Sequence, residues 1–141
     1  MKEFVIYLAG ASKNVPDEGF TWRKSAENEL YRYADILNYK IKVINPNDYF
    51  TYKEKRHKTN KQIKEFYMDK VRHSNLILVN LNNTNTSPGT AQELQCASDN
   101  LIPIIGFGTE NIYLWLSEAD CQVVFNEMNE AIEYIVNFYF N

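Results

Sequence analysis

The run Leu-Ile-Leu-Val-Asn-Leu at residues 76–81 constrains the fold more than any other segment of the chain. A nearly continuous apolar run of this length is typical of a strand buried on both faces, as in a parallel sheet. Parallel strands cannot be joined by tight hairpins, because each connection must cross back over the sheet, usually as a helix. The run therefore predicts a chain in which strands and helices alternate.

The rest of the sequence shows that alternation. Strand-like runs occur at residues 3–8, 42–44, 76–81, 102–107 and 122–125, and apolar residues at helical spacing occur at 22–37, 63–71, 88–98 and 128–136. A Thr-x-x-Gln capping box at residues 59–62 opens the second helix. Right-handed crossovers then predict an α/β fold, a three-layer sandwich with a doubly wound, mostly parallel, five-stranded sheet of flavodoxin or Rossmann-like type. We expect residues 1–141 to form a single domain.

Composition excludes several classes of protein. The net charge of −3 argues against binding a nucleic acid polymer, which requires a cationic excess. Two cysteines and two histidines, without metal-ligand spacing, predict neither a disulfide scaffold nor a metal site, and we expect no cofactor. No apolar stretch reaches membrane-spanning length, and the N-terminus runs into a strand without a signal peptide's cleavage region. These features predict a cytoplasmic protein without a membrane partner.

Ligands of such folds bind beyond the carboxyl ends of the strands. The segment after the third strand is the richest candidate. Ser87 suits a helix N-cap, Pro88 suits the first helical position, and Gly89 allows a ligand close to the backbone. Glu93 then falls in the first turns of the helix, where exposed N–H groups and the helix dipole favour an ionised carboxylate. Such a carboxylate can act as a nucleophile. The other candidate segments are residues 7–10, 45–49 and 106–108.

A second interpretation of Glu93 is structural. Residues 90–93, Thr-Ala-Gln-Glu, have the form of a capping box, in which Glu93 would bond back to the N–H of Thr90. The local motif alone supports both interpretations.

Four groups of residues resemble the nucleoside 2-deoxyribosyltransferase family, in the same order and over nearly the whole chain. They are Tyr7-Leu8-Ala9-Gly10, Trp22-Arg23, Asn45-Pro46, and Ser87-Pro88-Gly89-Thr90 followed by Glu93. The related nucleoside 5′-monophosphate N-glycosidases look similar and have a serine at the position of Ser87.

The resemblance implies a retaining, two-step displacement. Glu93 would attack C1′ of the deoxyribose and expel the base, and a second base or water would then take the sugar, by the logic of retaining glycosidases. Tyr7 would orient Glu93 by a hydrogen bond, and Gly89 and Thr90 would line the sugar site. In the family, neighbouring subunits complete each active site, so the resemblance also implies a homo-oligomer.

One part of the family pattern is missing. An acidic residue is expected on the helix before the third strand, and the counted position holds Tyr67. Asp69 is two positions away, about 200° round a helix. Either Asp69 or Asp48 takes the proton-handling role after a local shift, or Tyr67 replaces the acid, or the activity is altered. Asp69 is the acid we assign to the catalytic group.

Other residues have both a binding and a structural interpretation. Arg23 could hold a phosphate or a base carbonyl through its planar fork, and Gly10 ends the first strand beside the ligand. Trp22 could stack on a base or belong to the core. Asn82 could bind a base edge or form a turn. The basic run at residues 53–64 is either a solvated face or a lid over a phosphate. The aromatic tail at residues 134–140 suits a subunit interface.

Three functions remain open from the sequence. The first is base exchange between 2′-deoxyribonucleosides, with a nucleoside and a free nucleobase as partners and a role in nucleotide metabolism and salvage. The second is hydrolysis of a nucleoside 5′-monophosphate, which Ser87, Arg23 and the basic run favour. The third is a non-catalytic nucleotide-binding module, in which Glu93 is only a helix cap.

Overall fold

Five parallel strands form one sheet in the order β2-β1-β3-β4-β5. The structure is a computed structural model, and it describes residues 2–13, 15–49 and 59–140. The strands are β1 (Phe4–Gly10), β2 (Ile41–Ile44), β3 (Leu76–Asn80), β4 (Ile104–Phe107) and β5 (Val123–Phe125). The predicted α/β class is confirmed, and the sheet is entirely parallel rather than mostly so.

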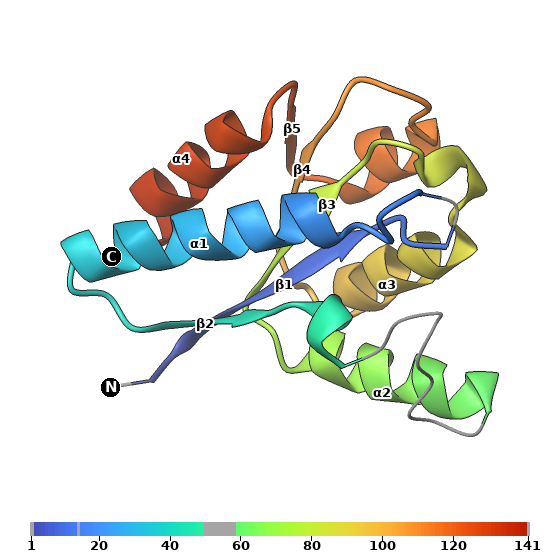
Figure 1. Cartoon of the computed structure of the whole chain (residues 1–141), viewed down its shortest axis with the longest axis horizontal. Helices are drawn as coiled ribbons and strands as arrows, with labels where there is room; N and C mark the ends of the chain where they lie inside the picture. Colours follow the sequence, from blue (N-terminus) through green and yellow to red (C-terminus); the bar gives the residue numbers. More distant parts are fainter. Residues whose placement is uncertain (1, 14, 50–58, 141) are drawn as a thin grey trace.

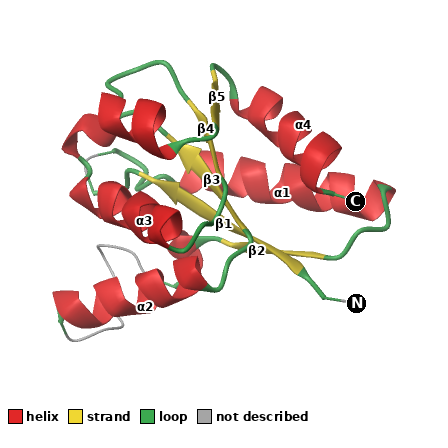
Figure 2. Cartoon of the chain, turned by 180° about the vertical axis from the view of Figure 1, so that it is seen from behind, coloured by secondary structure: helices red, strands yellow, loops and turns green. Residues whose placement is uncertain are grey.

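Helices cover both faces of the sheet, which gives three layers (Figures 1 and 2). Helices α1 (Phe20–Ile36) and α4 (Met128–Tyr139) pack together on one face. Helices α2 (Asn60–Arg72) and α3 (Pro88–Asp99) pack together on the other. Each sheet face therefore has its own apolar cluster beneath its helices.

Strand β3 is buried on both faces, as its sequence predicts. Leu76 and Leu78 pack into the cluster beneath α1 and α4, while Ile77 and Val79 pack into the cluster beneath α2 and α3. All four side chains are completely buried. Successive side chains of β3 point to opposite faces, and both faces are covered by an apolar layer. The sequence therefore shows no alternation of apolar and polar residues.

The strand order reverses between β1 and β3. The chain leaves β1 towards α1 on one face, and it leaves β3 towards α3 on the other. Gly10 and Asn80 are paired at the carboxyl ends of these two strands. A crevice forms where such connections diverge, and it is the usual ligand position in open parallel sheets.

Short helical turns follow β2 and β3, and another precedes β5. They are η1 (Pro46–Asp48), η2 (Thr84–Thr86) and η3 (Leu116–Asp120). Helical periodicity could not predict them, because three to five residues do not complete two turns. The capping box at Thr59 and Gln62 is confirmed by both of its hydrogen bonds. Most of the basic run falls at residues 53–58, which lie outside the described residues.

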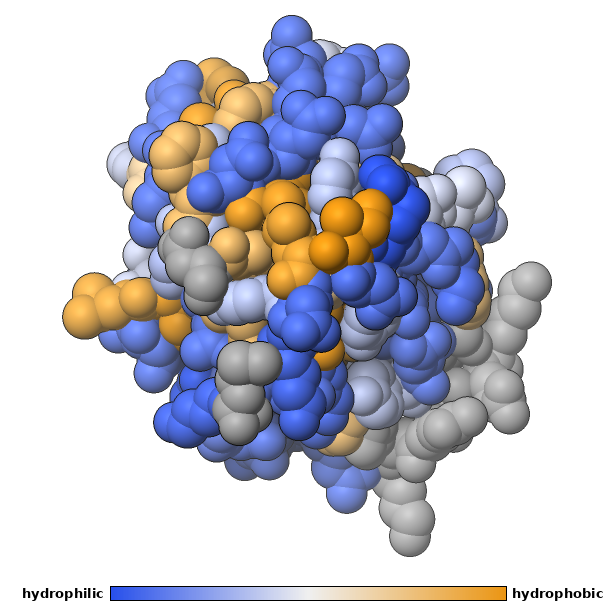
Figure 3. Space-filling view, turned by 90° about the vertical axis from the view of Figure 1, so that its left-hand side faces the viewer, coloured by the Kyte–Doolittle hydropathy of each residue, from blue (hydrophilic) through white to orange (hydrophobic). Residues whose placement is uncertain are grey.

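The aromatic tail packs mainly within the chain. Phe140 is buried and stacks on Tyr39, and Tyr134 and Tyr139 pack against the core, while Phe138 is exposed. Figure 3 shows an apolar area on the side of the molecule where α1 and α4 end. The homo-oligomer implied by the resemblance stays a prediction. Among the helices of the described residues, none has both the length and the apolar character needed to span a bilayer.

Helix α3 ends in a Schellman motif with an unusual residue at its left-handed position. The N–H of Ile102 bonds to the carbonyl of Ala97, and the N–H of Leu101 bonds to that of Ser98. Leu101 has a φ of 57°, where glycine is normally found, and its side chain is 91% exposed. The backbone of Leu101 is therefore strained, and its exposed side chain makes no buried contact that would offset the strain.

We predict that Leu101→Gly stabilises the protein by about 1 kcal/mol, because it removes the left-handed strain and no buried contact is lost. Thermal unfolding should show a melting temperature a few degrees higher. Leu101→Ala is the control, since alanine keeps the same backbone strain and should give little change. A lower stability for the glycine variant would contradict the strain argument.

Candidate active site

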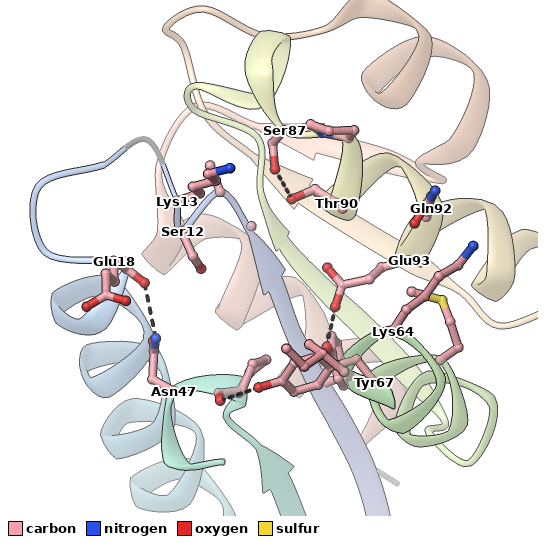
Figure 4. A pocket seen from close by; sticks show the side chains of 18 of the residues that line it. Ser12, Lys13, Glu18, Asn47, Lys64, Tyr67, Ser87, Thr90, Gln92 and Glu93 are labelled. Carbon is pink, nitrogen blue, oxygen red and sulfur yellow. Dashed lines mark hydrogen bonds between the residues drawn. The ribbon is translucent and has the colours of Figure 1, made fainter. Parts of the chain in front are cut away.

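A cavity of about 300 Å³ opens at the carboxyl ends of the strands, beside the point where the strand order reverses (Figure 4). Its walls come from the end of β1 and the loop after it, from η1, from α2, and from η2 with the start of α3. This volume suits a small organic ligand. The cavity therefore lies where the sequence predicted a ligand site.

Tyr7 and Glu93 meet inside this cavity. Tyr7 projects from β1 and is fully buried, and its hydroxyl donates a hydrogen bond to the carboxylate of Glu93 from α3. Glu93 lines the cavity and is half-buried, and desolvation of its carboxyl group disfavours the charged form. The contact that the resemblance implies is thus present.

Burial controls the protonation of this pair. It raises the pKa of Glu93 from 4.5 to about 7, against the opposing effects of the Tyr7 hydrogen bond and the Arg23 charge. Burial, together with the nearby Glu93 charge, raises the pKa of Tyr7 well above its ordinary value. Tyr7 therefore remains a hydrogen-bond donor, while both protonation states of Glu93 are populated near neutral pH.

The capping interpretation of Glu93 is wrong. Helix α3 begins at Pro88, with Ser87 at the N-cap position, so Glu93 is its sixth residue. Its carboxylate bonds to Tyr7 rather than to the N–H of Thr90, whose hydroxyl lies 2.6 Å from that of Ser87. The expected stabilisation by the helix dipole is also corrected, because that effect fades beyond the first turn and burial dominates here.

The guanidinium of Arg23 forms hydrogen bonds within the protein. It is only 2% exposed, and its guanidinium donates hydrogen bonds to backbone carbonyls and neutral side-chain oxygens around the cavity. The acceptors are Leu8 O (3.3 Å), Gly10 O (2.8 Å), Ser12 Oγ (3.0 Å), Glu18 O (3.2 Å) and Asn47 Oδ1 (3.2 Å). Five hydrogen bonds within the chain thus engage the planar fork that we expected to hold a phosphate or a base carbonyl, while Arg23 also lines the cavity.

Trp22 and Asn82 do not line the cavity, so their assignment to substrate binding is corrected. Trp22 packs against the core with its ring edge-on to Phe107, at a centroid distance of 5.6 Å. The side chain of Asn82 accepts the N–H groups of Thr109 and Glu110, both at 2.9 Å. The core and turn interpretations of these two residues therefore hold.

Asp69 is also outside the cavity. It is exposed on α2, where it lies 3.9 Å from Arg72 and 3.4 Å from His73 of the same helix. Its angular position on the helix directs it away from the site, so the structure does not support its assignment as the catalytic acid. Asp48 does not line the cavity either, whereas Tyr67 does, with its hydroxyl donating to Pro46 O at 3.1 Å.

The remaining predicted binding residues, Gly10, Ser87, Gly89 and Thr90, all line the cavity. Sequence reasoning missed several others, because nothing in their local pattern distinguishes them from loop or surface residues. They are Ser12, Lys13, Glu18, Met68 and Gln92, while Asn47 was noted only within the candidate segment 45–49 and Lys64 only as part of the basic run. In the part of the chain that the structure describes, no group of His, Cys, Asp and Glu is arranged to hold a metal ion.

Comparisons with known proteins find likeness in structure alone. No protein-family model matches the chain, and no curated protein matches its sequence. A 2-deoxyribosyltransferase from Bacillus psychrosaccharolyticus has a TM-score of 0.69 at 18% identity, covering 92% of this chain and 91% of that one. A 2-deoxyribosyltransferase from Leishmania mexicana has a TM-score of 0.66 at 18% identity, covering 96% and 98%.

A third structure, the CMP N-glycosidase of Clostridium botulinum, has a TM-score of 0.55 at 15% identity and covers 95% of this chain and 99% of that one. At identities this low, the structural likeness shows that the fold is shared and nothing more.

We predict that Glu93→Gln stabilises the protein at pH 8 and not at pH 5. A carboxyl group whose pKa is raised from 4.5 to about 7 destabilises the fold progressively as pH rises through that window. Glutamine removes this cost of about 1 to 3 kcal/mol while its carbonyl can still accept the Tyr7 hydrogen bond. Urea unfolding at the two pH values measures the difference.

The matched control for this experiment is Glu118→Gln. This exposed substitution should leave the free energy of unfolding unchanged at both pH values. An equal loss of stability at both pH values for Glu93→Gln would mean that Glu93 is only a structural residue.

Proposed function

We propose that this protein breaks the N-glycosidic bond of a nucleoside or nucleotide, with Glu93 as the nucleophile. The observation that carries the proposal is the Tyr7–Glu93 pair in the cavity at the strand ends. Support comes from the fold, which is shared with two 2-deoxyribosyltransferases and a CMP N-glycosidase. The chain is accordingly proposed as a member of the nucleoside 2-deoxyribosyltransferase family.

In the first step, a carboxylate oxygen of Glu93 forms a bond to C1′ of the sugar. The bond between C1′ and the base nitrogen breaks, and its electron pair leaves with the base. Tyr7 keeps its proton, and its hydrogen bond holds the other oxygen of the Glu93 carboxylate in place. The product of this step is a glycosyl ester of Glu93.

In the second step, a nitrogen of another base attacks C1′, the ester bond to Glu93 breaks and releases the carboxylate, and the attacking base gives up its N–H proton to solvent. The result is base exchange, while attack by water gives hydrolysis. The hydroxyl of Tyr67 lines the cavity where the family would have an acid. Because the Tyr67 hydroxyl already donates its proton to Pro46 O, the expelled base takes up a proton from solvent.

Hydrolysis of a nucleoside 5′-monophosphate is the second candidate. Two exposed cations, Lys13 and Lys64, line the cavity together with the Ser87 hydroxyl and Gly89 at the start of α3. Because Arg23 is engaged by the chain, these groups would have to meet a phosphate. The likeness to a CMP N-glycosidase favours the same candidate.

We predict that Glu93→Gln abolishes turnover, with a loss of about 10³-fold or more, because an amide cannot form the glycosyl ester. The assay incubates the protein with a deoxynucleoside and a second free base, and separately with deoxynucleoside monophosphates, and resolves the products by chromatography. A new nucleoside indicates exchange, and free base with sugar phosphate indicates hydrolysis.

The control in this assay is Asp69→Asn, which should retain activity because Asp69 faces solvent outside the cavity. Full activity of the Glu93→Gln variant would overturn the nucleophile assignment. Saturable nucleotide binding without any product would leave the non-catalytic module.

We also predict an acid limb in the pH dependence of kcat/KM. The pKa of Glu93 is raised to about 7 and only its ionised form can attack C1′, so activity should fall as pH decreases below that value. The fall should approach ten-fold per pH unit. Initial rates between pH 5 and pH 9 measure it, and a flat profile across pH 7 would exclude Glu93 as the titrating nucleophile.

A further inference from the structure

Arg23 is a buried cation at the edge of the cavity. It is among the largest fully buried side chains, and its position on α1 lets it reach round the carboxyl end of β1. Burying a charge is costly unless hydrogen bonds and an opposite charge compensate for it. For Arg23, the hydrogen bonds are made directly, whereas the opposite charge is not in contact with the guanidinium.

The hydrogen bonds of Arg23 all go to uncharged oxygens. Three acceptors are backbone carbonyls, and the other two are the hydroxyl of Ser12 and the amide oxygen of Asn47. Among the described residues, no carboxylate forms an ion pair with Arg23, and no cation forms one with Glu93. Within the described part of the cavity wall, neither the Arg23 guanidinium nor the Glu93 carboxylate has a contacting counter-ion.

Arg23 also joins three separate segments of the cavity wall. Its guanidinium connects the end of β1, the loop that follows, and η1 after β2. Asn47 closes the set by donating to Glu18 O at 3.1 Å. Gly19 has a φ of 79°, and a Cβ there would lie 2.3 Å from Nη1 of Arg23, so the loop fits closely against the guanidinium.

We propose that Arg23 is a positioning residue that fixes the cavity wall and supplies the countercharge for Glu93 across the cavity, without contacting the substrate. The positioning part rests on the proposed function, because it concerns the shape of the substrate site. The countercharge part concerns two side chains of the protein and can be measured without any substrate.

The surroundings of Glu93 support this assignment. Tyr7 faces it from β1, Arg23 from α1, Tyr67 and Lys64 from α2, and the cavity loop adds Lys13 and Glu18. Lys13 and Lys64 are exposed, so water and salt screen their charges. Arg23 is the buried cation of this set, and its charge lowers the pKa of Glu93 against the effect of burial.

The test is an infrared titration of the Glu93 carboxyl, isolated as the difference between each protein and the same protein carrying Glu93→Gln. Arg23→Met removes the charge, Arg23→Lys keeps the charge without the fork, and Arg32→Met removes an exposed charge from the same helix as the matched control. We expect the titration midpoint to move to higher pH with Arg23→Met, to move less with Arg23→Lys, and to stay unchanged with Arg32→Met.

Kinetics give a second, separate readout. With Arg23→Met the ratio of activity at pH 6 to that at pH 9 should fall about ten-fold. With Arg23→Lys, KM should rise because a single ammonium cannot hold three wall segments, and the pH profile should change less. An unchanged infrared midpoint in Arg23→Met would overturn the countercharge role, and a wild-type KM in Arg23→Lys would overturn the positioning role.

If Arg23→Met does not fold, Arg23→Lys decides alone, because a midpoint shifted far to higher pH despite the retained charge would contradict the countercharge role. If none of the proteins turns over any nucleoside or nucleotide, the proposed function fails. A shifted infrared midpoint would then still support the coupling between Arg23 and Glu93.

Discussion

The carboxyl group of Glu93, enclosed by protein, is the constraint on which the cavity depends. An ionised carboxylate in such surroundings loses its hydration, and the protein must replace that hydration with its own groups. Tyr7 supplies a hydroxyl from the central strand, and Arg23 supplies a positive charge from the opposite face of the sheet. Tyr7 projects from within β1 on the face that α3 covers, whereas Arg23 reaches the cavity round the carboxyl end of that strand.

Much of the fold could be predicted because its signals are local. The apolar run of β3, the spacing of apolar residues in four helices and the capping box at Thr59 each reflect contacts within one element or with one layer. The parallel sheet and the cavity position follow from them by general rules of connection. The short turns η1, η2 and η3 were missed because they are too short to show a period.

Side-chain direction at the site could not be predicted in the same way. Trp22 and Arg23 are neighbours, yet one packs into the core and the other turns to the cavity edge. Asp69 and Tyr67 lie two positions apart on α2, and only Tyr67 faces the cavity. Four partners of Arg23 lie at residues 8–18, but the fifth is Asn47, and the sequence around Arg23 contains no sign of that contact. The resemblance brought Glu93 and Tyr7 together, and the structure corrected the residues around them.

The two outer strands of the sheet are short. Strand β2 has four residues and presents Lys42 to solvent, and β5 has only three. An outer strand exposes unpaired N–H and C=O groups that can template the addition of a strand from another molecule, and a short or lysine-bearing edge limits this. The sheet thus offers little to a foreign strand at either end. The strand order places β1, β3 and β4 in the interior of the sheet, so only the two short strands are open to edge-to-edge aggregation.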